Sequence, residues 1–142
     1  VAYGGNYDQV MEAPVTIALF TDTDLQKRAR KIARVGGVKN FTDEQLQYFM
    51  QNLPAEFARY DAQQTSDYLA LNAGLVAMNL VLALTDQGIG TNIILGFDKS
   101  KINEVLDIEE RFRPEVLITV GYAAEKVEPS YRLPVDEIID KR

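Results

Sequence analysis

Hydrophobic and polar residues follow one another along the chain in blocks that predict strands and helices. Two runs rich in β-branched and aromatic residues, at positions 14–20 and 115–122, have the length and composition of buried strands. The first run opens on Pro14, which strands accept at their first position, and polar residues at 21–24 close it. The two predicted strands therefore lie far apart in the sequence, with helical patterns between them.

A first helix is predicted to begin after Asp24, which can cap it, and to run through Val35. Gly36 and Gly37 then end it. Its cationic residues are expected to face solvent: Lys27, Arg28, Arg30, Lys31 and Arg34.

Thr42 and Gln45 have the spacing of a capping box, which predicts the start of a second helix. Apolar residues follow at helical spacing, at Leu46, Phe49 and Met50. Because proline interrupts the hydrogen bonds of a helix interior, we expect this helix to break around Pro54.

A long helix is predicted over residues 63–87, with Gly88 as its C-cap. Its apolar run, 69–84, is shorter than the ~20 residues of a membrane span and contains Asn72 and Asn79, so we interpret it as a buried core helix. Apolar residues surround most of its circumference, as in a helix that serves both a core and a subunit contact. A central helix in one compact monomer has the same pattern, and the sequence leaves both interpretations open.

Downstream, Asp98 is expected to cap a short helix that ends at Leu106. Residues 125–142 are charged and contain two prolines, which indicates an extended arm and not a core element. No linker or repeat divides the chain, so we expect residues 1–142 to form a single domain of the α+β class.

The composition argues against several classes of function. The 142 residues carry a net charge of −6, so the chain lacks the basic footprint of proteins that bind nucleic acid or anionic membranes. It contains neither Cys nor His, which removes disulfides, thiolate and imidazole metal sites and any imidazole base. We therefore assign no catalytic side chain and no metal ligand, expect a cofactor to carry the chemistry, and expect a reducing, cytoplasmic location.

Two segments suggest which cofactor this is. Residues 88–97, Gly-Ile-Gly-Thr-Asn-Ile-Ile-Leu-Gly-Phe, form a mostly apolar loop that can lie flat against a planar ring and offer it a backbone N–H. Arg132, between Pro129 and Pro134, can hold a phosphate as a two-pronged fork. A planar ring and a phosphate together suggest flavin mononucleotide (FMN). Residues 93–95 could equally form a short strand, and Arg132 could be a plain surface charge.

Asn6 and Gln9 precede the first predicted strand. On a helix their amides would project from one side, where they could bind the polar edge of a pyrimidine-like ring. A role of Asn6 as a turn or cap residue is the alternative.

The order of these features resembles that of the FMN-dependent nitroreductase family. An Asn-containing segment precedes Ala13-Pro14, a strand, a variable helical excursion and a long helix. The glycine-containing loop, the second strand and Tyr131-Arg132-Leu133-Pro134 follow in that order. The resemblance covers nearly the whole chain, and the order and spacing of the features carry it more than any single motif.

The resemblance implies a nitroreductase-like α/β/α sandwich with a central antiparallel-type sheet and a long core helix. It also implies a homodimer with two FMN molecules in its interface. In such a protein reduced nicotinamide, NADH or NADPH, delivers a hydride through the flavin to a nitro compound, a quinone or a similar small planar acceptor. The aromatic residues of the excursion at 39–60 are the expected source of acceptor choice.

The resemblance further implies which residues bind FMN. Asn6 matches a residue that hydrogen-bonds the pyrimidine edge of the flavin, and Gln9 stands where a second contact, often from Lys, is made. One flavin face is covered, with a backbone N–H near flavin N5, by Ile93, Ile94, Leu95 and Gly96.

At the other end of the cofactor, Arg132 matches a phosphate-binding Arg, and Ser130 stands where a Lys is common. The family's N-terminal phosphate-binding segment has no counterpart in this chain, which begins at Val1. The alternative function is therefore a non-catalytic dimeric interaction domain that has lost flavin binding.

Overall fold

The computed structural model describes residues 1–36, 41–125 and 130–140. The helices are α1 (Gly5–Glu12), α2 (Leu25–Gly36), α3 (Asp43–Phe57), α4 (Ala62–Asp86), α5 (Ile102–Val105) and α6 (Val135–Ile138). The strands are β1 (Val15–Asp22), β2 (Gly90–Ile94) and β3 (Phe112–Gly121). Both predicted strands are confirmed as β1 and β3, and β2 agrees with the short strand that the sequence left open.

The three strands form one antiparallel sheet in the order β1-β3-β2, so the last strand in sequence is central in space. Ile118 of β3 pairs with Ile17 of β1 on one side and with Ile93 of β2 on the other. Ile118 is fully buried, as expected for the middle of the central strand. The long connections between the strands carry the helices that cover the sheet.

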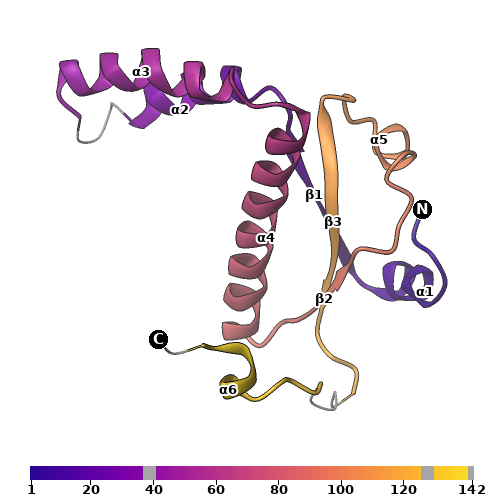
Figure 1. Ribbon diagram of the computed structural model, residues 1–142. Coiled ribbons are helices and arrows are strands. Elements are labelled where there is room, and N and C mark those ends of the chain that lie inside the picture. The colour runs from indigo at the N-terminus through magenta and orange to yellow at the C-terminus, as the bar shows by residue number, and fades with distance from the viewer. Residues whose placement is uncertain (37–40, 126–129, 141–142) are drawn as a thin grey trace.

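Helices cover both faces of the sheet, and alternate residues of β3 reach opposite layers (Figure 1). Leu117 belongs to a core cluster with Ile94, Phe97 and Ile102, on the face covered by α1 and α5. Val116 and Ile118 pack with Ala77 of α4 on the other face. The predicted α/β/α sandwich is therefore confirmed.

Helices α2 and α3 pack on each other and project away from the sheet as a hairpin, which Figure 1 shows at the upper left. The predicted capping box at the start of α3 is confirmed, because the Thr42 side chain accepts from the Gln45 amide and the Gln45 side chain accepts from the Thr42 amide. The predicted break at Pro54 is wrong: α3 continues to Phe57. Pro54 lies in the last turn and is buried, so few helical bonds are lost and its ring is packed.

The long helix α4 ends just before the glycine that the sequence predicted as its stop signal. Gly88 has a φ of +74° and follows the C-cap Gln87. Its N–H donates to the Thr85 carbonyl and that of Ile89 donates to the Leu84 carbonyl, which is the Schellman arrangement.

The expectation that Asp98 caps the next helix is wrong, because α5 begins only at Ile102. The Asp98 carboxylate instead accepts from the amide and the hydroxyl of Ser100 in the preceding turn. The C-terminal segment, expected to be an extended arm, contains the short helix α6, none of whose residues is buried.

Candidate functional site

Backbone pairing next to β2 brings the first turn of α1 against Gly96. Ala2 forms a β-bridge with Phe97, and the amide of Tyr3 donates to the carbonyl of Gly96 over 3.0 Å. The side-chain Nδ2 of Asn6 donates to the same Gly96 carbonyl over 3.3 Å. Residues that are 90 positions apart therefore meet at one point.

There is little room for a side chain at position 96, next to Asn6. A Cβ on Gly96 would lie 2.7 Å from Nδ2 of Asn6, closer than non-bonded atoms approach. Its φ lies outside the left-handed region, so the absence of a side chain at Gly96 gives the Asn6 amide its space, and backbone conformation does not demand glycine.

Gln9 lies on α1 one turn after Asn6 and is also held by β2. Its Oε1 accepts a hydrogen bond from Nδ2 of Asn92. The predicted projection of Asn6 and Gln9 from one side of a helix is supported by these contacts, since both side chains bond to β2 or to the residues that follow it.

A cavity of about 540 Å³ opens beside Gln9 and Asn92 at the ends of the three strands. Its walls combine amides, a carboxylate, small residues and one tyrosine, and include Glu12, Pro14, Thr91, Thr119, Gly121 and Tyr122. The cavity therefore offers mostly neutral polar groups and apolar surface.

The apolar residues after Asn92 separate between the two faces of the sheet. Ile94 is 1% exposed and belongs to the core beneath α1 and α5. Ile93 and Leu95 are exposed and line a second cavity, of about 370 Å³, against α4. The interpretation of residues 93–95 as a loop is wrong for Ile93 and Ile94, which belong to β2, and the side chain of Ile94 is available only to the core.

The C-terminal residues assigned to the phosphate do not converge on this site. Ser130 and Arg132 are exposed, and Nη1 of Arg132 donates to the carbonyl of its neighbour Tyr131 over 2.9 Å. Within the described part of the chain, no hydrogen bond or ion pair joins Arg132 to Asn6, Gln9 or Gly96. Pro129, expected to stiffen this segment, lies outside the described residues.

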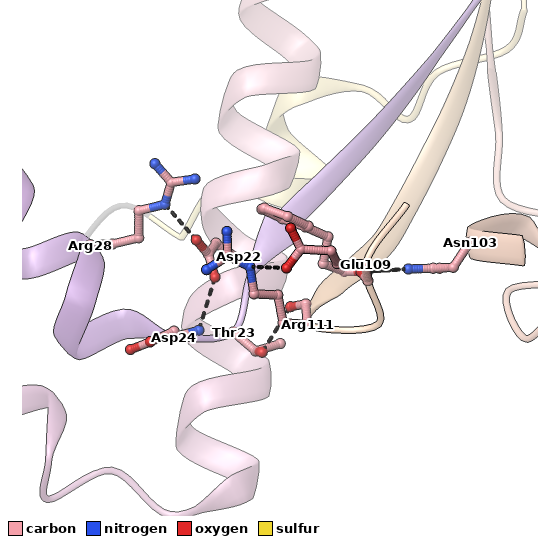
Figure 2. A network of polar contacts seen from close by, with 8 residues as sticks. Asp22, Thr23, Asp24, Arg28, Asn103, Glu109 and Arg111 are labelled. Carbon is pink, nitrogen blue, oxygen red and sulfur yellow. Dashed lines mark hydrogen bonds and ion pairs between the residues drawn. The ribbon is translucent and has the colours of Figure 1, made fainter. Parts of the chain in front are cut away.

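A polar network fixes the α2–α3 hairpin to the end of β1, as Figure 2 shows. Asp22 accepts from the Asp24 amide over 3.1 Å and from Nε of Arg28 over 2.6 Å. Burial raises the pKa of Asp22, but hydrogen bonds from Asp24 and Arg28 and the charges of Arg111 and Arg28 outweigh this, so its pKa lies below the ordinary value of 3.8. The carboxylate is therefore held in its charged form.

The same network ties the turn before β3. Thr23 donates from its hydroxyl to the carbonyl of Arg111 over 2.8 Å, and Asn103 donates to the carbonyls of Glu109 and Phe112. Nε of Arg111 lies 3.1 Å from a carboxylate oxygen of Glu109 and forms an ion pair with it. In the residues that the structure describes, no group of three or more carboxylates lies close enough to hold a metal ion.

A comparison with protein families identifies the fold. The model of the family described as "Nitroreductase family" matches residues 3–122. The chain belongs to the nitroreductase family. The resemblance read from the order of sequence features is thereby confirmed.

Individual nitroreductases agree with this assignment. A protein of Streptococcus pyogenes named "Putative NAD(P)H nitroreductase" is 62% identical over 137 residues, which cover 96% of this chain and 68% of that protein. A crystal structure of a nitroreductase family protein from Streptococcus pneumoniae is 83% identical, with a TM-score of 0.94 over 100% of this chain and 71% of the other.

A third relative was crystallised with a cofactor. The "putative nitroreductase in complex with FMN" from Exiguobacterium sibiricum is 27% identical, with a TM-score of 0.88 over 97% of this chain and 67% of that protein. The chain thus spans about two thirds of the length of the nitroreductases that it matches.

One candidate residue was missed by the sequence analysis. Asn92 bonds Gln9 and lines the same cavity, yet it lies within a run interpreted only for its apolar character. The available signal was a polar side chain two positions before a core residue, since both then lie on one face of a strand.

Proposed function

We propose that this nitroreductase chain carries the flavin-binding part of an FMN-dependent NAD(P)H oxidoreductase. The observation that carries the proposal is the convergence of Asn6 and Gln9, from α1, on Gly96 and Asn92 at β2. Two hydrogen bonds join these separate segments, and the Gln9–Asn92 pair lines a cavity, in a chain whose relatives include a protein crystallised with FMN.

The residues at this point fit the ring end of a flavin. The pyrimidine edge of the ring carries carbonyl oxygens and an N–H, and amide side chains can both donate to and accept from such groups. The flat apolar part of the ring can pack on small residues, which the walls of the cavity beside Gln9 supply. Asn6, Gln9 and the main chain at residues 95–96 are the proposed contacts of the ring.

The phosphate end is proposed to bind Arg132, with Ser130 as a neutral donor beside it. Arg132 is exposed and, among the described residues, bonds only a backbone carbonyl of its own segment, so its guanidinium can turn toward a phosphate at little cost. Bound FMN would supply the chemistry of hydride transfer between reduced nicotinamide and an acceptor. The protein side chains bind and orient the reactants, and none acts as acid or base in this proposal.

A second copy of the chain is proposed to complete the molecule. The long helix α4 buries only one side, and large apolar side chains on its other sides are open: Leu71, Leu75, Val76, Met78 and Leu82. By length and composition α4 could also cross a membrane, but its buried side packs on the sheet as a core helix does. A homodimer that covers this surface would agree with the first of the two interpretations, in which α4 serves both a core and a subunit contact.

The acceptor is proposed to be a small planar molecule such as a nitro compound or a quinone. The α2–α3 hairpin and the turn that follows carry two aromatic clusters, one around Phe49 and one around Phe57. Aromatic side chains can stack on planar acceptors. The hairpin projects from the chain that carries it, so it is suited to reach the site of a second copy (Figure 1).

Titration of the purified chain with FMN, followed by the quenching of flavin fluorescence, tests the proposal. We expect saturable binding at one FMN per chain. An absence of binding, with the chain folded by circular dichroism, would favour the non-catalytic interaction domain instead. The variant Asn6→Leu is expected to bind FMN more weakly with no loss of helical signal.

A further inference from the structure

Asn92 is a polar residue in the middle of β2, between Thr91 and Ile93. Ile94, two positions further on, lies on the same face of the strand and is buried. The Asn92 side chain is turned toward α1, where its Nδ2 donates to Oε1 of Gln9. The two residues are 83 positions apart, so this bond ties two segments that chain connectivity does not bring together.

The side-chain amides of Gln9 and Asn92 form a hydrogen-bonded pair in which each amide keeps one group free to bind a ligand. Gln9 keeps its NH₂ group and Asn92 keeps its carbonyl oxygen, and neither makes another hydrogen bond in the described residues. Reversal of the oxygen and nitrogen of both amides would again leave one donor and one acceptor. Both side chains line the cavity of about 540 Å³. The pair therefore presents a donor and an acceptor side by side to whatever enters the cavity.

A side chain that is already fixed in its binding conformer loses less conformational entropy when a ligand binds. Gln has three rotatable side-chain bonds, and a bound state that requires one conformer must offset the loss of that freedom. The bond from Asn92 selects a conformer of Gln9 before any ligand arrives, so less freedom is lost on binding.

We propose that Asn92 is a positioning residue, which holds Gln9 so that its amide meets the polar edge of the flavin ring. This inference rests on the proposed function, because it takes a ring with adjacent carbonyl and N–H groups as the ligand. Asn92 then affects ring binding through Gln9 and has no influence on the phosphate. The NH₂ group that Gln9 keeps can donate to a carbonyl oxygen of that ring edge.

A double-mutant cycle tests this role. Asn92→Leu and Gln9→Leu, each of similar size to the residue replaced, are made singly and together, and FMN and riboflavin are titrated against all four proteins. Asn52→Ala is the matched control, since Asn52 is an exposed asparagine on α3 that bonds only the Tyr48 carbonyl within its own helix. Thermal unfolding of each variant reports any purely structural effect.

Each single substitution is expected to weaken both flavins by the same factor, about threefold to tenfold, the effect of one neutral hydrogen bond. In the Gln9→Leu background, Asn92→Leu should add no further loss, because the group through which it acts is gone. Asn52→Ala should change neither flavin affinity.

Independent, additive losses would contradict the inference, as would a lower unfolding temperature of Asn92→Leu with unchanged flavin affinity. A lower unfolding temperature with unchanged flavin affinity would mean that the amide pair has a structural role only, in holding α1 against β2. If wild type binds flavin and Asn92→Leu binds it equally well, this inference fails and the proposed function stands. If wild type binds neither flavin, both are overturned.

Discussion

At the scale of single residues, Gly96 determines how closely α1 approaches the end of β2. A methyl group at this position would lie 2.7 Å from Nδ2 of Asn6. Because that nitrogen ends a flexible side chain, the clash can be relieved by turning the Asn6 amide away. Gly96→Ala is therefore expected to weaken FMN at least tenfold, with little change in the free energy of unfolding.

Gly88→Ala is the matched control, and we expect the opposite result. Gly88 has a φ of +74° and open space around it, so alanine there costs about 1–2 kcal/mol of stability through backbone strain. Its FMN affinity should stay unchanged. Flavin titration and thermal unfolding of both variants check the pair, and a folded Gly96→Ala variant with normal FMN affinity would contradict the site.

Arg132 is the residue at which the phosphate role can be tested. If it holds the FMN phosphate, Arg132→Ala removes a charge-assisted contact of about 1.5–3 kcal/mol and weakens FMN roughly ten- to a hundredfold. Riboflavin, which has no phosphate, should bind as before, and Arg132→Lys should recover part of the loss. Equal weakening of both flavins would mean that Arg132 acts through the folding of its segment.

The sequence predicted the residues of this site unevenly, for physical reasons. Asn6 and Gln9 could be found because helical spacing alone places their amides on one side. Asn92 was missed, because its alternation with Ile94 places both on one face of a strand but does not show which element packs on that face. Ile94 was assigned to the segment that covers the flavin, and its side chain lies in the core, since β2 alternates between the two layers.

At the scale of elements, polar contacts of Asp22 at the end of β1 hold the α2–α3 hairpin to the sheet. Asp22, whose side chain is 7% exposed, receives hydrogen bonds from the Asp24 amide and from Arg28. Asp22→Asn keeps the shape but removes the charge opposite Arg28. We expect a loss of about 1–2 kcal/mol in the free energy of unfolding, since Arg28 is partly exposed and solvent screens the pair.

The lowered pKa of Asp22 predicts how the free energy of unfolding changes in acid. The folded-state pKa of Asp22 is lowered, so the charged group contributes stability above its unfolded pKa of about 3.9. That contribution is lost as the pH falls through the lower, folded pKa. Urea unfolding from neutral pH into the acid range should show wild type and Asp22→Asn converging at low pH. A constant difference at every pH would contradict the role of the charge.

Element ends were predicted well where a local motif determines them. The capping box at Thr42 and the glycine stop at Gly88 involve residues within one turn of each other, so the sequence contains the whole interaction. The predicted helix break around Pro54 was wrong because a proline ring can lie in the last turn of a helix when it packs in a buried place. That packing depends on the tertiary structure and not on the local sequence.

At the scale of the whole molecule, the open apolar side of α4 predicts an obligate dimer. Interfaces of this kind commonly bury more than about 2,000 Å². Leu75→Asp is expected to dissociate or unfold the dimer. Val105→Asp, at an equally exposed position on α5 (64% for both), should leave it intact. Light scattering over a dilution series checks this, and a stable folded monomer of wild type would contradict the prediction.

The order of features along the chain predicted the family and, through it, the α/β/α layers, but it did not predict the order of the strands in the sheet. Composition and periodicity identified β1, β3 and α4, which are long and strongly patterned. The central place of β3 follows from long-range pairing with both other strands, and no local signal encodes it. For the same reason the meeting of Asn6 with Gly96 could be expected only from the resemblance.

The measurement that tests the central claim most directly is an anaerobic reduction of the FMN-loaded protein. Addition of NADH or NADPH should bleach the visible absorption band of the bound flavin, and a quinone or nitro compound added afterwards should restore it. Asn6→Leu, loaded at the same low FMN concentration, should show a smaller signal in proportion to its weaker binding. A protein that binds FMN but is neither reduced by either nicotinamide nor reoxidised by any acceptor would contradict the proposed oxidoreductase function.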